Sequence, residues 1–178
     1  MTALVEQGDG ELPPEVLKDG LGGVVNDALK KAIEKEQIPI SDMCLDLSDT
    51  VDELKKFQAD AEKDPSPFWK ATYRFAYAQA NMRLAFAHEA NLALGNVRTD
   101  SLPEGGDKGL RLVQVPKMKN RKEAPLGKAA QEQFEVIAKE HKGTPWEVLA
   151  KQWRSISLGL EWRAKPADAD TTMAMEGK

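Results

Sequence analysis

The stretch SPFWKATYRFAYAQANMRLAFAHEANLALGN, residues 66–96, decides the fold. Its apolar residues recur every three or four positions, with no proline after Pro67, and this predicts one long helix. One apolar stripe contains Trp69, Tyr73, Ala76, Ala80, Leu84, Ala87 and Leu94, and a second contains Phe68, Phe75, Met82, Phe86 and Ala93. The stripes lie roughly 120° apart on a helical wheel. A helix that is apolar on two sides is expected to pack between two neighbours.

Four shorter amphipathic segments surround this central helix. The first, about 23–37, is expected to end before Pro39, because proline disfavours helical backbone at the preceding residue. The second, about 47–63, carries a capping-box pattern at Thr50 and Glu53 and stops at the Asp-Pro-Ser-Pro turn of residues 64–67. Two more helices are predicted over about 123–141 and 144–162. The fold class is therefore all-α, with two antiparallel helical hairpins over 47–96 and 123–162.

The segment between the hairpins, residues 97–122, breaks the helical pattern. Residues 110–115, LRLVQV, alternate as a strand does, but no partner strand is apparent, so an extended loop is expected. The remaining organisation is a flexible acidic segment over 1–22, one helical domain over 23–163 and a disordered tail over 164–178.

Composition excludes several classes of protein. One cysteine among 178 residues excludes a disulfide framework and a cysteine-based zinc site, and two histidines without an HExxH pattern exclude the common histidine metal motifs. No apolar run is long enough to cross a membrane. The acidic N-terminus lacks the apolar core of a secretory signal, so a cytoplasmic location is expected.

Charge divides the chain into two unequal parts. Residues 1–64 hold 16 acids and 7 bases, whereas residues 65–165 hold 10 acids and 17 bases. The densest basic part is PKMKNRK, which contains Lys117, Lys119, Arg121 and Lys122. Its simplest role is to complement the acidic part, and its alternative role is to bind an acidic partner. Nucleic acid is the less favoured partner because stacking aromatic residues are missing there.

Several short motifs are better explained by structure than by chemistry. Residues 46–50, DLSDT, resemble the metal-binding loop of von Willebrand factor A domains, but they lack the buried strand that precedes such a loop and are expected to cap a helix. His88 and Glu89 begin a zinc-protease string whose second histidine is missing. Cys44 is expected in the core. No metal, cofactor or catalytic residue is predicted.

A weak internal repeat links the two predicted hairpins. Phe57 and Trp69 are separated by the same interval as Phe134 and Trp146, and a Phe-Trp contact across each hairpin is expected. The second unit resembles bacterial tetratricopeptide-type hairpins, whose turn is commonly H-P-x-S-P-W-x-x-x-A; the matching residues are His141, Gly143, Thr144, Pro145, Trp146 and Ala150. The first unit departs from this pattern because Phe68 separates Pro67 from Trp69.

A second resemblance covers about residues 66–162. The segments ANMRLAFAHEANLALGNVR, LPEGGDKGLRLV and HKGTPWEVLAKQWRSISLGLEWR are similar to a helical region near the C-terminus of some large planctomycete proteins that carry a von Willebrand factor A domain. This resemblance implies a helical adaptor or accessory module and implies no catalytic residues.

These observations predict a non-catalytic protein-interaction or scaffold module, with self-association left open. The candidate partner-binding residues are the polar strip of the central helix and the tryptophan beyond the second hairpin's stripe: Arg74, Tyr77, Asn81, His88 and Trp162. Two alternatives remain: polyanion binding through the basic loop 108–122, and a small enzyme that uses the polar strip. The acidic N-terminal region is also a candidate to occupy a basic groove until a partner displaces it.

Overall fold

The computed structural model describes residues 22–99 and 109–164, which contain five helices and three short strands. The expected N-terminal segment and C-terminal tail therefore lie almost entirely outside the described residues. The helices are α1 (Asp27–Lys56), α2 (Gln58–Lys63), α3 (Pro67–Arg98), α4 (Ala124–Glu140) and α5 (Pro145–Arg154), and the strands are β1 (Gly22–Gly23), β2 (Leu110–Val115) and β3 (Gly159–Ala164).

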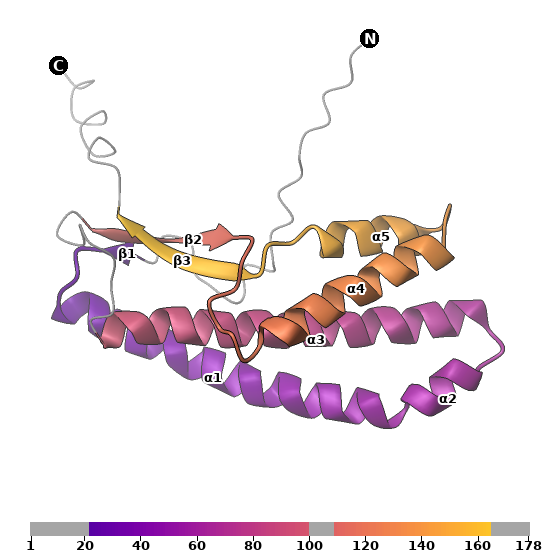
Figure 1. The fold of residues 1–178 in the computed structure, drawn as a ribbon. Helices are drawn as coiled ribbons and strands as arrows, with labels where there is room; N and C mark the ends of the chain where they lie inside the picture. Colours follow the sequence, from indigo (N-terminus) through magenta and orange to yellow (C-terminus); the bar gives the residue numbers. More distant parts are fainter. Residues whose placement is uncertain (1–21, 100–108, 165–178) are drawn as a thin grey trace, which may run out of the picture.

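The long helix α3 lies at the centre, as its two apolar stripes predicted. Pro67 is its first residue, and the Ser66 Oγ accepts a hydrogen bond from the Trp69 amide at 3.4 Å. α1 packs along one side of α3, while α4 and β3 pack on the other (Figure 1). Both stripes contribute to one continuous core, in which Met82, Leu94 and Phe134 are completely buried.

Helix α1 corrects the prediction that a helix ends before Pro39. It is 30 residues long and runs through this proline. The predicted cap Thr50 lies inside it, with its hydroxyl donating to the Asp46 carbonyl. An internal proline removes one backbone hydrogen bond and costs about 3 kcal/mol. Burial of Ile33, Ile40 and other residues against α3, on both sides of Pro39, offsets this cost.

A small antiparallel sheet corrects two further expectations. LRLVQV is not a loop: it forms β2, whose partner is β3 in a register that places Leu112 opposite Trp162 and Val115 opposite Gly159. The helix predicted over 144–162 ends at Arg154, and the chain then turns back as β3. The protein is thus mostly helical, and the strand order of its sheet is β1-β2-β3.

The aromatic repeat does not produce two equivalent units. Phe57 and Trp69 are 58% and 59% exposed, so the expected contact across the first hairpin is wrong. In the second unit Phe134 is completely buried and packs against Phe75 and Trp153, whereas Trp146 packs against Phe68 and Phe75. The ring contacts of the described residues therefore do not include the expected Phe134–Trp146 pair either. Cys44 is buried in the core, as predicted.

In the part of the chain that the structure describes, no helix is both long and apolar enough to span a bilayer.

The close approach of β3 to the basic loop gives a stability prediction. A Cβ at Gly159 would lie 2.1 Å from the Lys117 carbonyl oxygen. We therefore expect Gly159→Ala to lower the free energy of unfolding in urea by about 3 kcal/mol, because backbone atoms must move. Gly95→Ala is the control, since its Cβ would meet nothing closer than 3.6 Å, and it should change stability by less than about 1 kcal/mol. Equal effects of the two substitutions would contradict this account.

Candidate functional site

Arg74, the predicted anchor of the polar strip, is engaged within the protein. Its guanidinium donates two hydrogen bonds to Glu62, at 2.9 and 2.7 Å, and a third to Glu140. It thereby links α2, α3 and α4. The hydrogen bond from Arg74 lowers the pKa of the Glu62 carboxyl below its ordinary value. This arrangement explains Arg74 as a structural tie between helices.

The other strip residues do not form a shared polar site. Asn81 is buried, and its amide donates to the Tyr77 carbonyl on the same helix at 2.8 Å. The Tyr77 ring stacks on Tyr73, with ring centroids 6.1 Å apart. His88 is half-buried, and its carbonyl accepts a long 3.5 Å hydrogen bond from the Asn120 amide group.

Trp162 is part of the core instead of an open contact surface. It lies on β3, is 6% exposed, and its indole Nε1–H donates to the Ala93 carbonyl at 2.7 Å. This bond fixes β3 on the C-terminal half of α3. An incoming partner would have to displace the strand to reach the ring.

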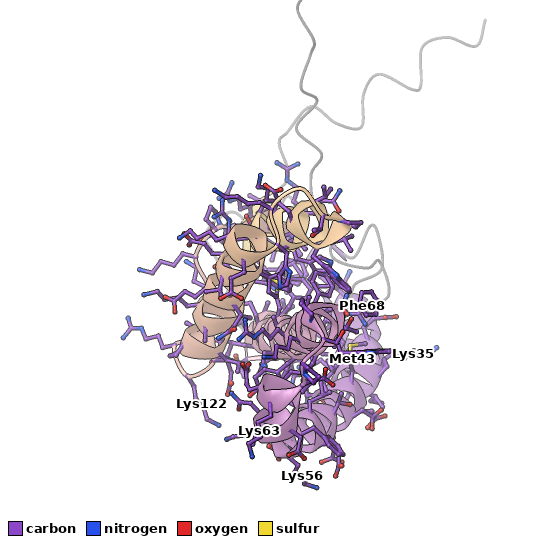
Figure 2. All side chains as sticks on the ribbon, turned by 90° about the vertical axis from the view of Figure 1, so that its right-hand side faces the viewer. Lys35, Met43, Lys56, Lys63, Phe68 and Lys122 are labelled. Atoms are coloured by element: carbon purple, nitrogen blue, oxygen red, sulfur yellow. The ribbon has the colours of Figure 1, made fainter. Side chains whose placement is uncertain are left out.

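The four basic-loop residues lie on the surface between β2 and α4, and they differ in their electrostatic surroundings. Lys119 pairs with Glu161 at 2.9 Å, and Lys122 lies 3.7 Å from Glu123. Lys122 projects from the outer surface near the start of α4, on the opposite side of the view from Phe68 (Figure 2). Within residues 22–99 and 109–164, Lys117 and Arg121 make no ion pair or side-chain hydrogen bond.

A hollow of about 530 Å³ lies beside these two cations. We call it the basic hollow; its lining residues are Pro116, Lys117, Met118, Arg121, Ala124, Pro125, Lys128, Gln131 and Leu158. Lys117, Arg121 and Lys128 are exposed, and Lys128 pairs with Glu132 at 3.6 Å, whereas Met118 and Leu158 are buried. The arrangement is an apolar floor with a positively charged rim.

The floor of the basic hollow is tightly packed from beneath. A Cβ at Gly127 would lie 2.7 Å from a methyl group of Leu158 and 3.0 Å from the Met118 sulfur. An alanine at residue 127 would therefore make the buried Leu158 and Met118 side chains shift. Because the floor is fixed by close packing, the hollow exists before a ligand arrives.

Glu89 holds the basic loop in place, and sequence reasoning missed it. Its side chain is 1% exposed. One carboxylate oxygen accepts hydrogen bonds from the Lys119 amide at 2.7 Å and the Leu160 amide at 3.1 Å, and the other accepts from the Asn120 amide at 2.8 Å. Three backbone donors stabilise a buried carboxylate that would otherwise be costly.

Neutralising Glu89 should therefore loosen the loop. We expect Glu89→Gln to lower the free energy of unfolding by about 2–3 kcal/mol, because one side-chain oxygen that accepts a backbone N–H becomes an NH₂ donor. Amide hydrogen exchange should accelerate at Lys119, Asn120 and Leu160. Glu132→Gln, on the exposed face of α4, is the control and should stay within about 0.5 kcal/mol of the wild type. A wild-type exchange pattern in Glu89→Gln would disprove the anchoring role.

The Arg74 tie should depend on pH. The folded-state pKa of Glu62 is lowered. The contribution of the Glu62–Arg74 ion pair to the free energy of unfolding is therefore complete above the ordinary glutamate pKa, and it is lost as pH falls through the folded-state pKa. Arg74→Met should thus cost about 1 kcal/mol at pH 7, a value limited by the exposure of the glutamates, and less at an acidic pH at which the Glu62 carboxyl has taken up a proton. Urea denaturation at both pH values measures the difference. Lys63→Met, an exposed control on α2, should show no such dependence, and a cost for Arg74→Met that persists in acid would refute the tie.

No protein-family model matches the chain, and no curated protein and no solved structure is significantly similar to it. The tetratricopeptide and planctomycete resemblances therefore stay predictions.

Proposed function

We propose that this protein is a non-catalytic interaction module that binds an acidic segment of a protein partner in the basic hollow. The observation that carries the proposal is the combination of a preformed apolar floor with Lys117 and Arg121, whose charges no described acid neutralises. Apolar contacts with the floor supply affinity, and the cations orient an acidic chain. The expected helical-hairpin character of the chain supports the same class of function.

The shape of the hollow favours a peptide over a nucleic acid. Its lining contains no aromatic side chain on which a base could stack, and its floor consists of aliphatic and thioether groups. A peptide that alternates acidic and aliphatic residues matches both parts. Nucleic-acid binding remains the second candidate, because exposed cations also bind phosphates.

An enzymatic role is the weaker alternative. The polar strip would have to supply its catalytic groups, yet Arg74 and Asn81 are engaged in hydrogen bonds inside the protein. Turnover lost in an Arg74→Ala/His88→Ala variant would support this alternative.

A defined peptide probe tests the proposal. The probe is a fluorescein-labelled Glu-Glu-Leu-Glu-Glu-Leu-Glu-Glu peptide, followed by fluorescence anisotropy. We expect Lys117→Gln/Arg121→Gln/Lys128→Gln to weaken binding by roughly tenfold, equivalent to about 1.4 kcal/mol. Replacing the two leucines of the probe by serine should weaken binding to the wild type by a similar factor, because the floor then has no apolar partner.

A matched charge change elsewhere on the surface serves as the control. Lys35→Gln/Lys56→Gln/Lys63→Gln removes three exposed cations from α1 and α2, all labelled in Figure 2. It should leave probe affinity nearly unchanged. Equal losses in the two triple variants would reject a localised site. Tighter binding of a labelled oligothymidylate than of the peptide, with the same dependence on Lys117, would favour nucleic acid instead.

A further inference from the structure

One edge of the small sheet leads directly to the basic hollow. β1 pairs with β2 only at Gly22–Arg111 and Gly23–Leu110, so the β2 edge from Leu112 to Val115 has no strand partner among the described residues. β2 is followed at once by Pro116 and Lys117, which line the hollow. An exposed strand edge presents unpaired amide and carbonyl groups that favour the addition of another strand.

The antiparallel register gives the direction of the chain before Gly22. Moving back one residue from Gly22 corresponds to moving forward one residue from Arg111 along β2. The hollow begins at Pro116, five residues beyond Arg111, or roughly 17 Å at about 3.3 Å per residue. The chain that precedes Gly22 has 21 residues, which is ample length for this span.

The composition of this preceding segment complements the hollow. Residues 1–21 contain five acids and a single lysine. Their sequence ELPPEVLKDG, residues 11–20, places aliphatic side chains between carboxylates. The same alternation of acidic and aliphatic groups is what the charged rim and apolar floor require. Residues 15–21 contain no proline, so each of them can donate a backbone hydrogen bond to a neighbouring strand.

We propose that the chain's own acidic segment, residues 11–21, adds to the free edge of β2 and occupies the basic hollow, so that a partner must compete with it. This inference rests on the proposed function of the hollow. In the register of β1, residue 18 would face Val115, and Glu15 would reach the level of Met118, next to Lys117. The segment is therefore an intramolecular competitor whose strength depends on its charge.

Zero-length crosslinking of the full chain tests the contact. A carbodiimide joins a carboxylate to a lysine amine only where the two groups touch. We expect crosslinks from Glu11 or Glu15 to Lys117 or Lys128, with a yield that dilution does not change and high salt abolishes. Crosslinks that spread over exposed lysines such as Lys35 and Lys63, or that disappear on dilution, would overturn the proposal.

Competition is measured with the acidic leucine probe described above. The full-length variant Glu6→Gln/Asp9→Asn/Glu11→Gln/Glu15→Gln/Asp19→Asn should bind the probe several-fold more tightly than the wild type. Its matched control removes five exposed acids from α1: Asp42→Asn/Asp46→Asn/Asp49→Asn/Asp52→Asn/Glu53→Gln. The control separates competition at the hollow from a general change in net charge.

The outcomes distinguish this inference from the proposed function. Equal probe affinity in the two five-acid variants would refute the competition while leaving the hollow as a binding site. Failure of the probe to bind any variant would refute the proposed function, and the crosslinks alone would then decide whether the segment contacts the hollow. Tighter binding in the N-terminal variant alone would support both.

Discussion

The buried carboxylate of Glu89 is the interaction on which the described architecture depends. Glu89 lies on α3, and its carboxylate accepts backbone hydrogen bonds from the basic loop and from β3. The three elements therefore meet at this side chain. A carboxylate in such a place is stable only when its donors are present, so the loop and the strand must be correctly placed for Glu89 to be buried. The surface cations therefore lie on a loop whose backbone is held by hydrogen bonds to the buried Glu89 carboxylate.

The helical part of the fold could be predicted because its signals are local. Residues 66–96 carry two apolar stripes, and the Ser66-Pro67 start matched α3 closely. The same reasoning located α4. It failed at Pro39, where a local rule about proline predicted a break and the apolar stripe on either side of it prevailed. Packing of α1 against α3 outweighed the tendency of Pro39 to break the helix. The strength of that packing cannot be read from a single sequence.

The sheet could not be predicted because its signal is not local. Residues 110–115 alternate as a strand, but their partner lies more than forty residues later, at 159–164. The apolar residues that lead into β3 also recur in steps of three and four: Trp146, Leu149, Trp153, Ile156 and Leu160. This periodicity fits a helix, so it favoured a helix over 144–162 and hid the strand. One clue to the candidate site was present: residue 89 lies on the stripe of Phe75, Met82, Phe86 and Ala93. A charged residue on an apolar stripe indicates a buried, hydrogen-bonded group.

Ion pairing determines which part of the basic half is available to a partner. The sequence singled out four cations in PKMKNRK by density alone, but the fold pairs Lys119 with Glu161 and places Lys122 beside Glu123. Lys117 and Arg121 have no acidic partner among the described residues, and both line the hollow whose floor is closely packed. A partner that binds there has little ordering entropy to lose on the protein side, so a modest contact area suffices for selective binding. In the proposed competition, the acidic segment of residues 11–21 binds intramolecularly, so an effective concentration set by the length of the connecting chain, and not the protein concentration, determines how strongly it competes.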